Sequence, residues 1–115
     1  MQIVYFGSGQ FAVPALQALL GAGHEVVAVV TQPDRPAGRG RKLQPTPVAQ
    51  IARDRGLRVM PVQNVNEPAV TGEILTLGAR LGVVAAFGQK IGRALLEGFP
   101  AGLINAHASL LPKYR

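Results

Sequence analysis

The sequence predicts an α/β fold with a doubly wound, mostly parallel sheet. Short apolar runs alternate with helix-like segments along the whole chain, in the order β-α-β-α-β-α-β-α-β. Two of the runs, residues 26–30 and 81–87, are almost entirely apolar, which is typical of parallel strands covered on both faces. An alternating order of this kind favours right-handed crossovers into a single sheet.

The N-terminal segment predicts a strand over residues 2–6 and a helix over residues 11–20. Gly21 and Gly23 would end that helix. Apolar residues at helical spacing would form its buried face, namely Phe11, Ala15, Leu16, Leu19 and Leu20.

The turn between this strand and helix reads Gly-Ser-Gly-Gln-Phe-Ala at residues 7–12, which matches the G-x-G-x-x-G/A pattern of dinucleotide-binding loops. Such loops need an acid at the end of the second strand to bind the ribose, but Thr31 and Gln32 stand there. A tight turn is therefore the favoured explanation, and dinucleotide binding is the alternative.

The middle of the chain predicts a strand over residues 26–30 and then a break over residues 32–47, rich in Pro, Gly and Arg. The break is longer than the roughly two to six residues usual between a strand and a helix, so we expect it to be functional or mobile. Thr46 would cap the next helix, with Pro47 at its first position and an end near Arg55.

The rest of the chain predicts strands over 57–62, 81–87 and 102–106. Between them we expect a helix over 67–77 capped by Asn66 and a short helix over 91–96. Ligands of such sheets bind at the carboxyl ends of the strands. Residues 87–89 and 105–107 fall at such ends, so we expect the site there.

Composition excludes several classes of protein. The chain has no cysteine, which excludes disulfides, thiolate catalysis and cysteine-bound metals. It has no apolar run near the roughly 20 residues of a membrane span and no basic leader, so a cytoplasmic protein without membrane contact is expected. Residues 34–58 hold seven basic and two acidic side chains. This excess fits a polyanion such as RNA, and a solvated surface is the equal alternative.

Asn105 and His107 are the candidate catalytic pair. Residues two apart in an extended segment point to the same side, so an amide and an imidazole can meet at one reacting atom. The amide can donate to a carbonyl oxygen that gains charge, and the imidazole can donate or move a proton. Residues 109–112, Ser-Leu-Leu-Pro, would form a wall for a flat heteroaromatic ligand or merely begin the next loop.

Two motifs resemble a known family. Residues 105–115, Asn-Ala-His-Ala-Ser-Leu-Leu-Pro-Lys-Tyr-Arg, resemble the signature of 10-formyltetrahydrofolate-dependent formyltransferases. Residues 31–48 resemble an insertion found in the branch of that family that formylates methionyl initiator tRNA. Residues 6–12 match the family's opening, with Ser-Gly in place of its usual Thr-Pro. The resemblance spans all 115 residues.

The resemblance implies a Rossmann-like N-terminal domain, monomeric in the whole enzyme and without a metal, of which this chain is the first part. A catalytic aspartate and a C-terminal β-barrel would follow, and residues 1–115 alone would be inactive. The implied partners are initiator methionyl-tRNA and the co-substrate 10-formyltetrahydrofolate. The implied site residues are Asn105 and His107 for catalysis; Phe87, Gly88, Gln89, Lys90, Ile91, Ser109, Leu110, Leu111 and Pro112 for the folate; and Arg35, Arg39, Arg41 and Lys42 for the tRNA.

Three alternatives remain open at this point. A formyltransferase for a small amine, such as glycinamide ribonucleotide, would share Asn105 and His107 but would not need the arginine-rich segment. A dinucleotide-binding domain would depend on residues 7–12. A non-catalytic RNA-binding module would keep the basic segment and be indifferent to the loss of His107.

Overall fold

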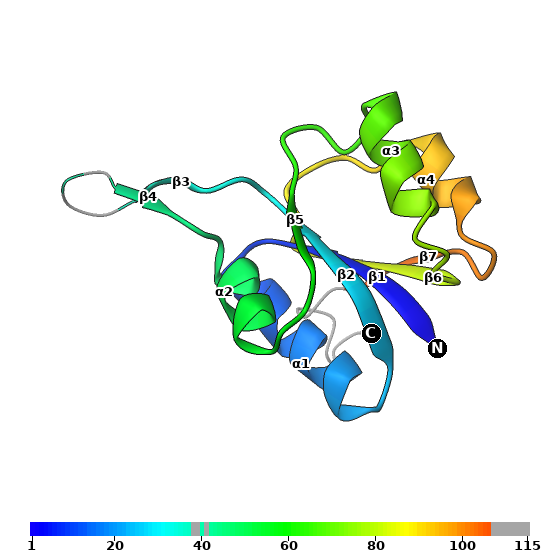
Figure 1. The fold of residues 1–115 in the computed structure, drawn as a ribbon, viewed down its shortest axis with the longest axis horizontal. Helices are drawn as coiled ribbons and strands as arrows, with labels where there is room; N and C mark the ends of the chain where they lie inside the picture. The colour runs from blue at the N-terminus through cyan, green and yellow to red at the C-terminus, as the bar shows by residue number, and fades with distance from the viewer. Residues whose placement is uncertain (38–39, 41, 107–115) are drawn as a thin grey trace, which may run out of the picture.

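The computed structural model describes residues 1–37, 40 and 42–106, and it has a five-stranded sheet in the order β5-β2-β1-β6-β7 (Figure 1). Every neighbouring pair in this sheet is parallel. The predicted doubly wound sheet is therefore confirmed. Its strands are β1 (Gln2–Gly7), β2 (Glu25–Thr31), β5 (Val59–Pro61), β6 (Leu81–Ala85) and β7 (Leu103–Asn105).

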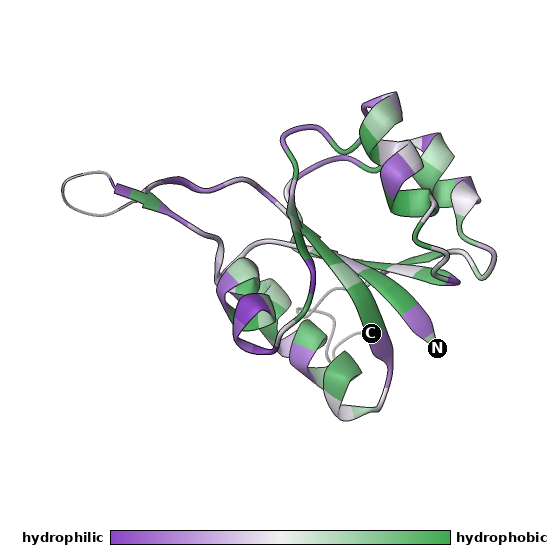
Figure 2. Cartoon of the chain, viewed as in Figure 1, coloured by the Kyte–Doolittle hydropathy of each residue, from purple (hydrophilic) through white to green (hydrophobic). Residues whose placement is uncertain are grey.

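Helices cover both faces of the sheet (Figure 1). Helices α1 (Val13–Gly21) and α2 (Pro47–Asp54) lie on one face, and α3 (Pro68–Leu75) and α4 (Arg93–Gly98) on the other. Side chains of β1 alternate between the two resulting cores: Val4 and Phe6 belong to one, and Ile3 and Tyr5 to the other. This double burial explains why the sheet strands are apolar along their length (Figure 2). None of the described helices has the length and hydropathy that crossing a membrane requires.

The first helix differs from its prediction at its start. It opens with a 3-10 turn, η1 (Gln10–Ala12), and only then becomes α1. A 3-10 turn advances three residues per turn, so the helical periodicity does not apply there. As a result Phe11, predicted on the buried face, is 78% exposed, and Ala12 is buried instead. Leu16 is buried as predicted.

The predicted cap at Asn66 is wrong. Glu67 is the N-cap of α3, and no side chain caps it. Asn66 bonds across the chain instead: its Nδ2 donates to the Lys90 carbonyl at 2.8 Å, and its Oδ1 accepts from the Gly92 N–H at 2.8 Å. These bonds hold the segment before the helix, residues 90–92, extended up to the N-cap Gly92. Helix α4 therefore begins at Arg93 rather than at the predicted residue 91.

The predicted break over residues 32–47 contains regular structure. Strands β3 (Arg35–Ala37) and β4 (Lys42–Gln44) pair antiparallel and form a hairpin that stands away from the sheet (Figure 1). The chain returns from the hairpin into α2, where the Thr46 hydroxyl accepts from the Ala49 N–H at 3.0 Å. The predicted cap at Thr46 and the Pro47 start of α2 are confirmed.

Candidate functional site

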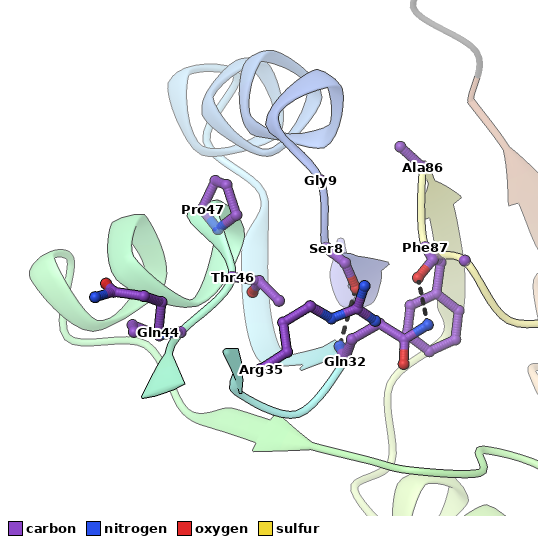
Figure 3. Close-up of a pocket in the computed structure, with 11 residues that line it drawn as sticks. Ser8, Gly9, Gln32, Arg35, Gln44, Thr46, Pro47, Ala86 and Phe87 are labelled. Atoms are coloured by element: carbon purple, nitrogen blue, oxygen red, sulfur yellow. Dashed lines mark hydrogen bonds between the residues drawn. The ribbon is translucent and has the colours of Figure 1, made fainter. Parts of the chain in front are cut away.

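A cavity lies at the carboxyl ends of the central strands. Strand β1 pairs with β2 on one side and β6 on the other, so the chain changes direction across the sheet at this point. The cavity has a volume of about 420 Å³ and is shared by three segments. The end of β1, the hairpin with its return to α2, and residues 86–88 after β6 all line it (Figure 3).

Close packing explains the first glycine of the 7–12 turn. A Cβ on Gly7 would lie 2.7 Å from Cε2 of Tyr5 and 2.9 Å from the Ala85 carbonyl oxygen. The N–H groups of Ser8 and Gly9 then donate to the Ala86 carbonyl at 3.1 and 3.2 Å. The turn therefore fastens β1 to the end of β6, which supports the tight-turn interpretation of Gly7.

Three hydroxyl groups join the two roots of the hairpin to β1. Thr31 Oγ1 lies 2.6 Å from Thr46 Oγ1 and donates to Ser8 Oγ at 3.3 Å. The Gln32 N–H donates to Ser8 Oγ at 2.9 Å (Figure 3). All three hydroxyl residues are buried. The hairpin leaves the sheet after Thr31 and returns at Thr46, so this cluster fixes where the hairpin stands.

The segment after β6 has an unusual backbone. Ala86 has a φ of 47° and Gly88 a φ of 86°, both in the left-handed region that L side chains rarely adopt. The turn at Ala86 ends β6 two residues before its predicted end. The Phe87 ring is 2% exposed and packs edge-on against Phe6 at a centroid distance of 5.7 Å. Its ring is thus an anchor in the core beneath the cavity.

Asn105 ends β7, where it pairs in register with Val84 of β6. Its side chain is exposed at the same carboxyl edge as the cavity. The other catalytic candidate, His107, and the predicted folate wall at Ser109, Leu110, Leu111 and Pro112 lie outside the described residues. The pairing of Asn105 with His107 therefore stays a prediction.

The remaining predicted folate residues differ in exposure. Lys90 is exposed and its carbonyl is bonded to Asn66. Ile91 is partly buried against the core. Gln89 uses its side-chain amide for hydrogen bonds within the protein. Their contact with a folate also stays a prediction.

Among the described residues of the hairpin, the cations Arg35 and Lys42 form no ion pair with an acidic side chain. Arg35 reaches from β3 toward the strand ends and lines the cavity (Figure 3). Lys42 is exposed on β4. Within the described residues the ion pairs are Arg58–Glu73 at 3.4 Å and Arg93–Glu97 at 3.7 Å, both away from the hairpin. Arg39 and Arg41 fall outside those residues. Among all the described residues, no group of His, Asp and Glu side chains is able to hold a metal.

Sequence reasoning missed most of the polar residues around the cavity. Gln32 and Gln44 both line it, and Ser8 and Thr31 belong to the hydroxyl cluster. Their position in the sequence was the signal that could have identified them. Ser8, Thr31 and Gln32 all lie at or just after strand ends, where polar residues interrupt apolar runs.

Comparison with known proteins identifies the family to which this sequence and fold are similar. The family model described as formyl transferase matches residues 1–115. The chain is 49% identical over its full length to a methionyl-tRNA formyltransferase of Symbiobacterium thermophilum and covers 35% of that protein. It is 50% identical to the one of Chloroflexus aurantiacus, covering 37% of it, and 51% identical over 114 residues to the one of Trichlorobacter lovleyi, covering 36%. The chain thus spans little more than a third of the length of these relatives.

Proposed function

The chain belongs to the formyl transferase family, and we propose that it forms the N-terminal part of a catalytic domain that formylates initiator methionyl-tRNA for translation initiation in the cytoplasm. The formyl donor is 10-formyltetrahydrofolate, a co-substrate, and the reaction uses no metal. The rest of the catalytic domain, a third catalytic residue and a C-terminal β-barrel follow this part in the whole enzyme, which acts as a monomer.

One observation carries the proposal: an exposed, positively charged hairpin stands directly beside a cavity at the carboxyl ends of the strands. Arg35 belongs to both the hairpin and the cavity lining. A small amine would need only the cavity. A hairpin that presents cations next to that cavity suits a substrate whose reactive end is attached to a polyanion.

The acceptor arm of the tRNA would lie along the hairpin, with its phosphates near Arg35, Arg39, Arg41 and Lys42. Phosphate contacts of this kind orient a nucleic acid without reading its sequence. The aminoacylated 3′ end would then enter the cavity, whose lining combines apolar Pro45 and Pro47 with polar Ser8 and Gln44. Such mixed linings are usual for small-molecule sites.

The transfer step would take place at the β7 end. The methionyl α-amine attacks the formyl carbon, a C–N bond forms, and the carbonyl oxygen gains negative charge. Asn105 and His107 donate hydrogen bonds that polarise this oxygen. The bond from the formyl carbon to N10 of the folate then breaks, and the proton released by the amine passes to N10 with His107 as the carrier. Residues 87–91 and 109–112 hold the folate.

The test is a side-by-side assay of the full-length gene product with 10-formyltetrahydrofolate. Initiator methionyl-tRNA and glycinamide ribonucleotide are offered separately, and His107→Ala is the comparison variant. We expect formylation of the tRNA alone and its loss in the variant. Transfer to the small amine alone would overturn the tRNA assignment, and residues 1–115 by themselves should transfer nothing.

A further inference from the structure

Two glutamine side chains join the hairpin root to the segment proposed to line the folate site. We propose that Gln32 and Gln89 are positioning residues that together form an amide bridge. The bridge fixes residues 86–90, which would hold the folate, relative to the hairpin, which would hold the tRNA, so that the two substrates are correctly oriented toward each other. This inference rests on the proposed function. Neither residue is proposed to touch the reacting atoms.

Both donors of the Gln89 side-chain amide are used within the protein. Its Nε2 donates to Gln32 Oε1 at 3.0 Å and to the Val62 carbonyl at 2.7 Å. Its Oε1 accepts from the Val65 N–H at 2.8 Å. A primary amide has two N–H donors, and both are used here. Gln89 therefore has no donor left for a ligand, and its contribution to a folate site would be indirect.

Gln32 makes the second half of the bridge. Its Nε2 donates to the Phe87 carbonyl at 3.3 Å (Figure 3). Its Oε1 accepts from Gln89 Nε2 at 3.0 Å. Its own N–H donates to Ser8 Oγ at 2.9 Å. One residue at the hairpin root is thus bonded to the end of β1 and, twice, to the segment after β6. Both glutamines are partly buried, which strengthens these bonds relative to exposed ones.

The segment after β6 needs such support. Ala86 is a non-glycine residue in the left-handed region, a conformation that costs free energy and persists only where surrounding contacts hold it, whereas Gly88 adopts its positive φ at little cost. A Cβ on Gly88 would lie 2.9 Å from Gln32 Nε2, so the bridge passes against this backbone. The bridge thereby stabilises the backbone shape of residues 86–90 and ties that shape to the hairpin.

The experiment uses the full-length enzyme and the variants Gln32→Met, Gln89→Met and the double variant, with exposed Gln17→Met on α1 as matched control. Steady-state assays vary 10-formyltetrahydrofolate and initiator methionyl-tRNA in turn, and thermal unfolding is followed in parallel. We expect each single variant to raise the KM for both substrates by about threefold to tenfold, the effect of losing one or two hydrogen bonds. The double variant should be no worse than the more affected single one, because both break the same bridge. Gln17→Met should leave both KM values unchanged.

Gln89→Glu separates positioning from simple packing. At neutral pH its carboxylate would face the Val62 carbonyl and Gln32 Oε1 without donors, so both KM values should rise. Protonation at lower pH restores one donor, and the KM ratio of variant to wild type should fall as the pH is lowered. A lower unfolding temperature with unchanged KM values in Gln32→Met and Gln89→Glu would overturn the inference. If the unaltered enzyme transfers no formyl group, the proposed function fails and the inference fails with it; an active enzyme with unaffected variants refutes the bridge alone.

Discussion

The strand-end cluster, formed by Ser8, Thr31, Gln32, Thr46 and Gln89, contrasts with the hairpin that it anchors. Every side-chain polar group of the cluster has a hydrogen-bond partner within the protein, and no buried side-chain nitrogen or oxygen among the described residues lacks one. The hairpin exposes Lys42, Leu43 and Gln44 in succession. It is also more hydrophilic than the sheet (Figure 2).

This difference separates two tasks. A buried network with all partners satisfied is costly to disturb, because each broken bond leaves a buried polar group without water. A two-stranded hairpin on the surface contributes little to stability, but its described cations, Arg35 and Lys42, are exposed and available to an anionic partner. Substitutions in the cluster should therefore change both the free energy of unfolding and the position of the segments that the cluster joins, whereas substitutions of the exposed hairpin cations should change binding alone.

The largest expected effect tests whether the chemistry belongs to the strand ends rather than to the hairpin. In the full-length enzyme, Asn105→Ala should lower kcat by about 10²–10³-fold, the usual cost of losing one donor to a developing oxyanion. Because Asn105 is exposed at the end of β7, the thermal midpoint should change little. Gln17→Ala, which removes an exposed amide side chain on α1, is the control. A kcat within twofold of wild type would remove Asn105 from the catalytic site.

The next effect tests how tightly the strand ends are packed. Gly7→Ala should lower the free energy of unfolding by about 1–3 kcal/mol, because the new methyl group would meet Tyr5, Ala85 and Ala12 within 3.0 Å. Gly21→Ala is the matched control: nothing lies within 4 Å of its Cβ position, and it should be neutral or stabilising by up to roughly 1 kcal/mol. Urea titration of the full-length protein measures both. Equal effects of the two substitutions would refute the packing argument.

A smaller effect connects the two regions. Thr46→Ala removes the N-cap of α2 and the hydroxyl partner of Thr31, so the free energy of unfolding should fall by about 1 kcal/mol. Since Thr46 is also a root of the hairpin, the affinity for initiator tRNA should fall with it. The exposed Thr76, bonded to the Glu73 carbonyl, gives the control Thr76→Ala, which should leave tRNA affinity unchanged. Unchanged tRNA affinity in Thr46→Ala as well would show that the hairpin does not depend on this anchor.

The sequence predicted the sheet because its strands are apolar on both faces, and their order alone placed residues 87–89 and Asn105 at one edge. It did not predict the hairpin, because three-residue strands with no apolar alternation carry no periodic signal. The local rules failed at Phe11 and Asn66, where a 3-10 turn and a tertiary hydrogen bond override them.

The bridge was beyond prediction for a different reason. Gln32 and Gln89 are 57 residues apart in the chain, and nothing in the residues around either one indicates the other. Hydrogen bonds between loops depend on how the strand ends come together in space. The order of elements indicates the edge of the sheet at which the cavity lies, but the side chains that shape the cavity become visible only in three dimensions.

The smallest expected effect tests the hairpin itself. Lys42→Ala should weaken binding of initiator tRNA and lower the slope of log affinity against log salt by about 1, the loss of one phosphate contact. Folate affinity and the free energy of unfolding should not change, because Lys42 is exposed and its side chain makes no bond to the strand-end cluster. The matched control is Arg80→Ala, because Arg80 is exposed and lies at the amino ends of the strands, opposite the cavity. There its backbone N–H donates to the Gln2 carbonyl, a bond that the substitution leaves in place. Binding measured over a salt series distinguishes the outcomes. If both variants lower the slope equally, the cations act only through net charge, and the hairpin is an ordinary solvated surface rather than a binding element.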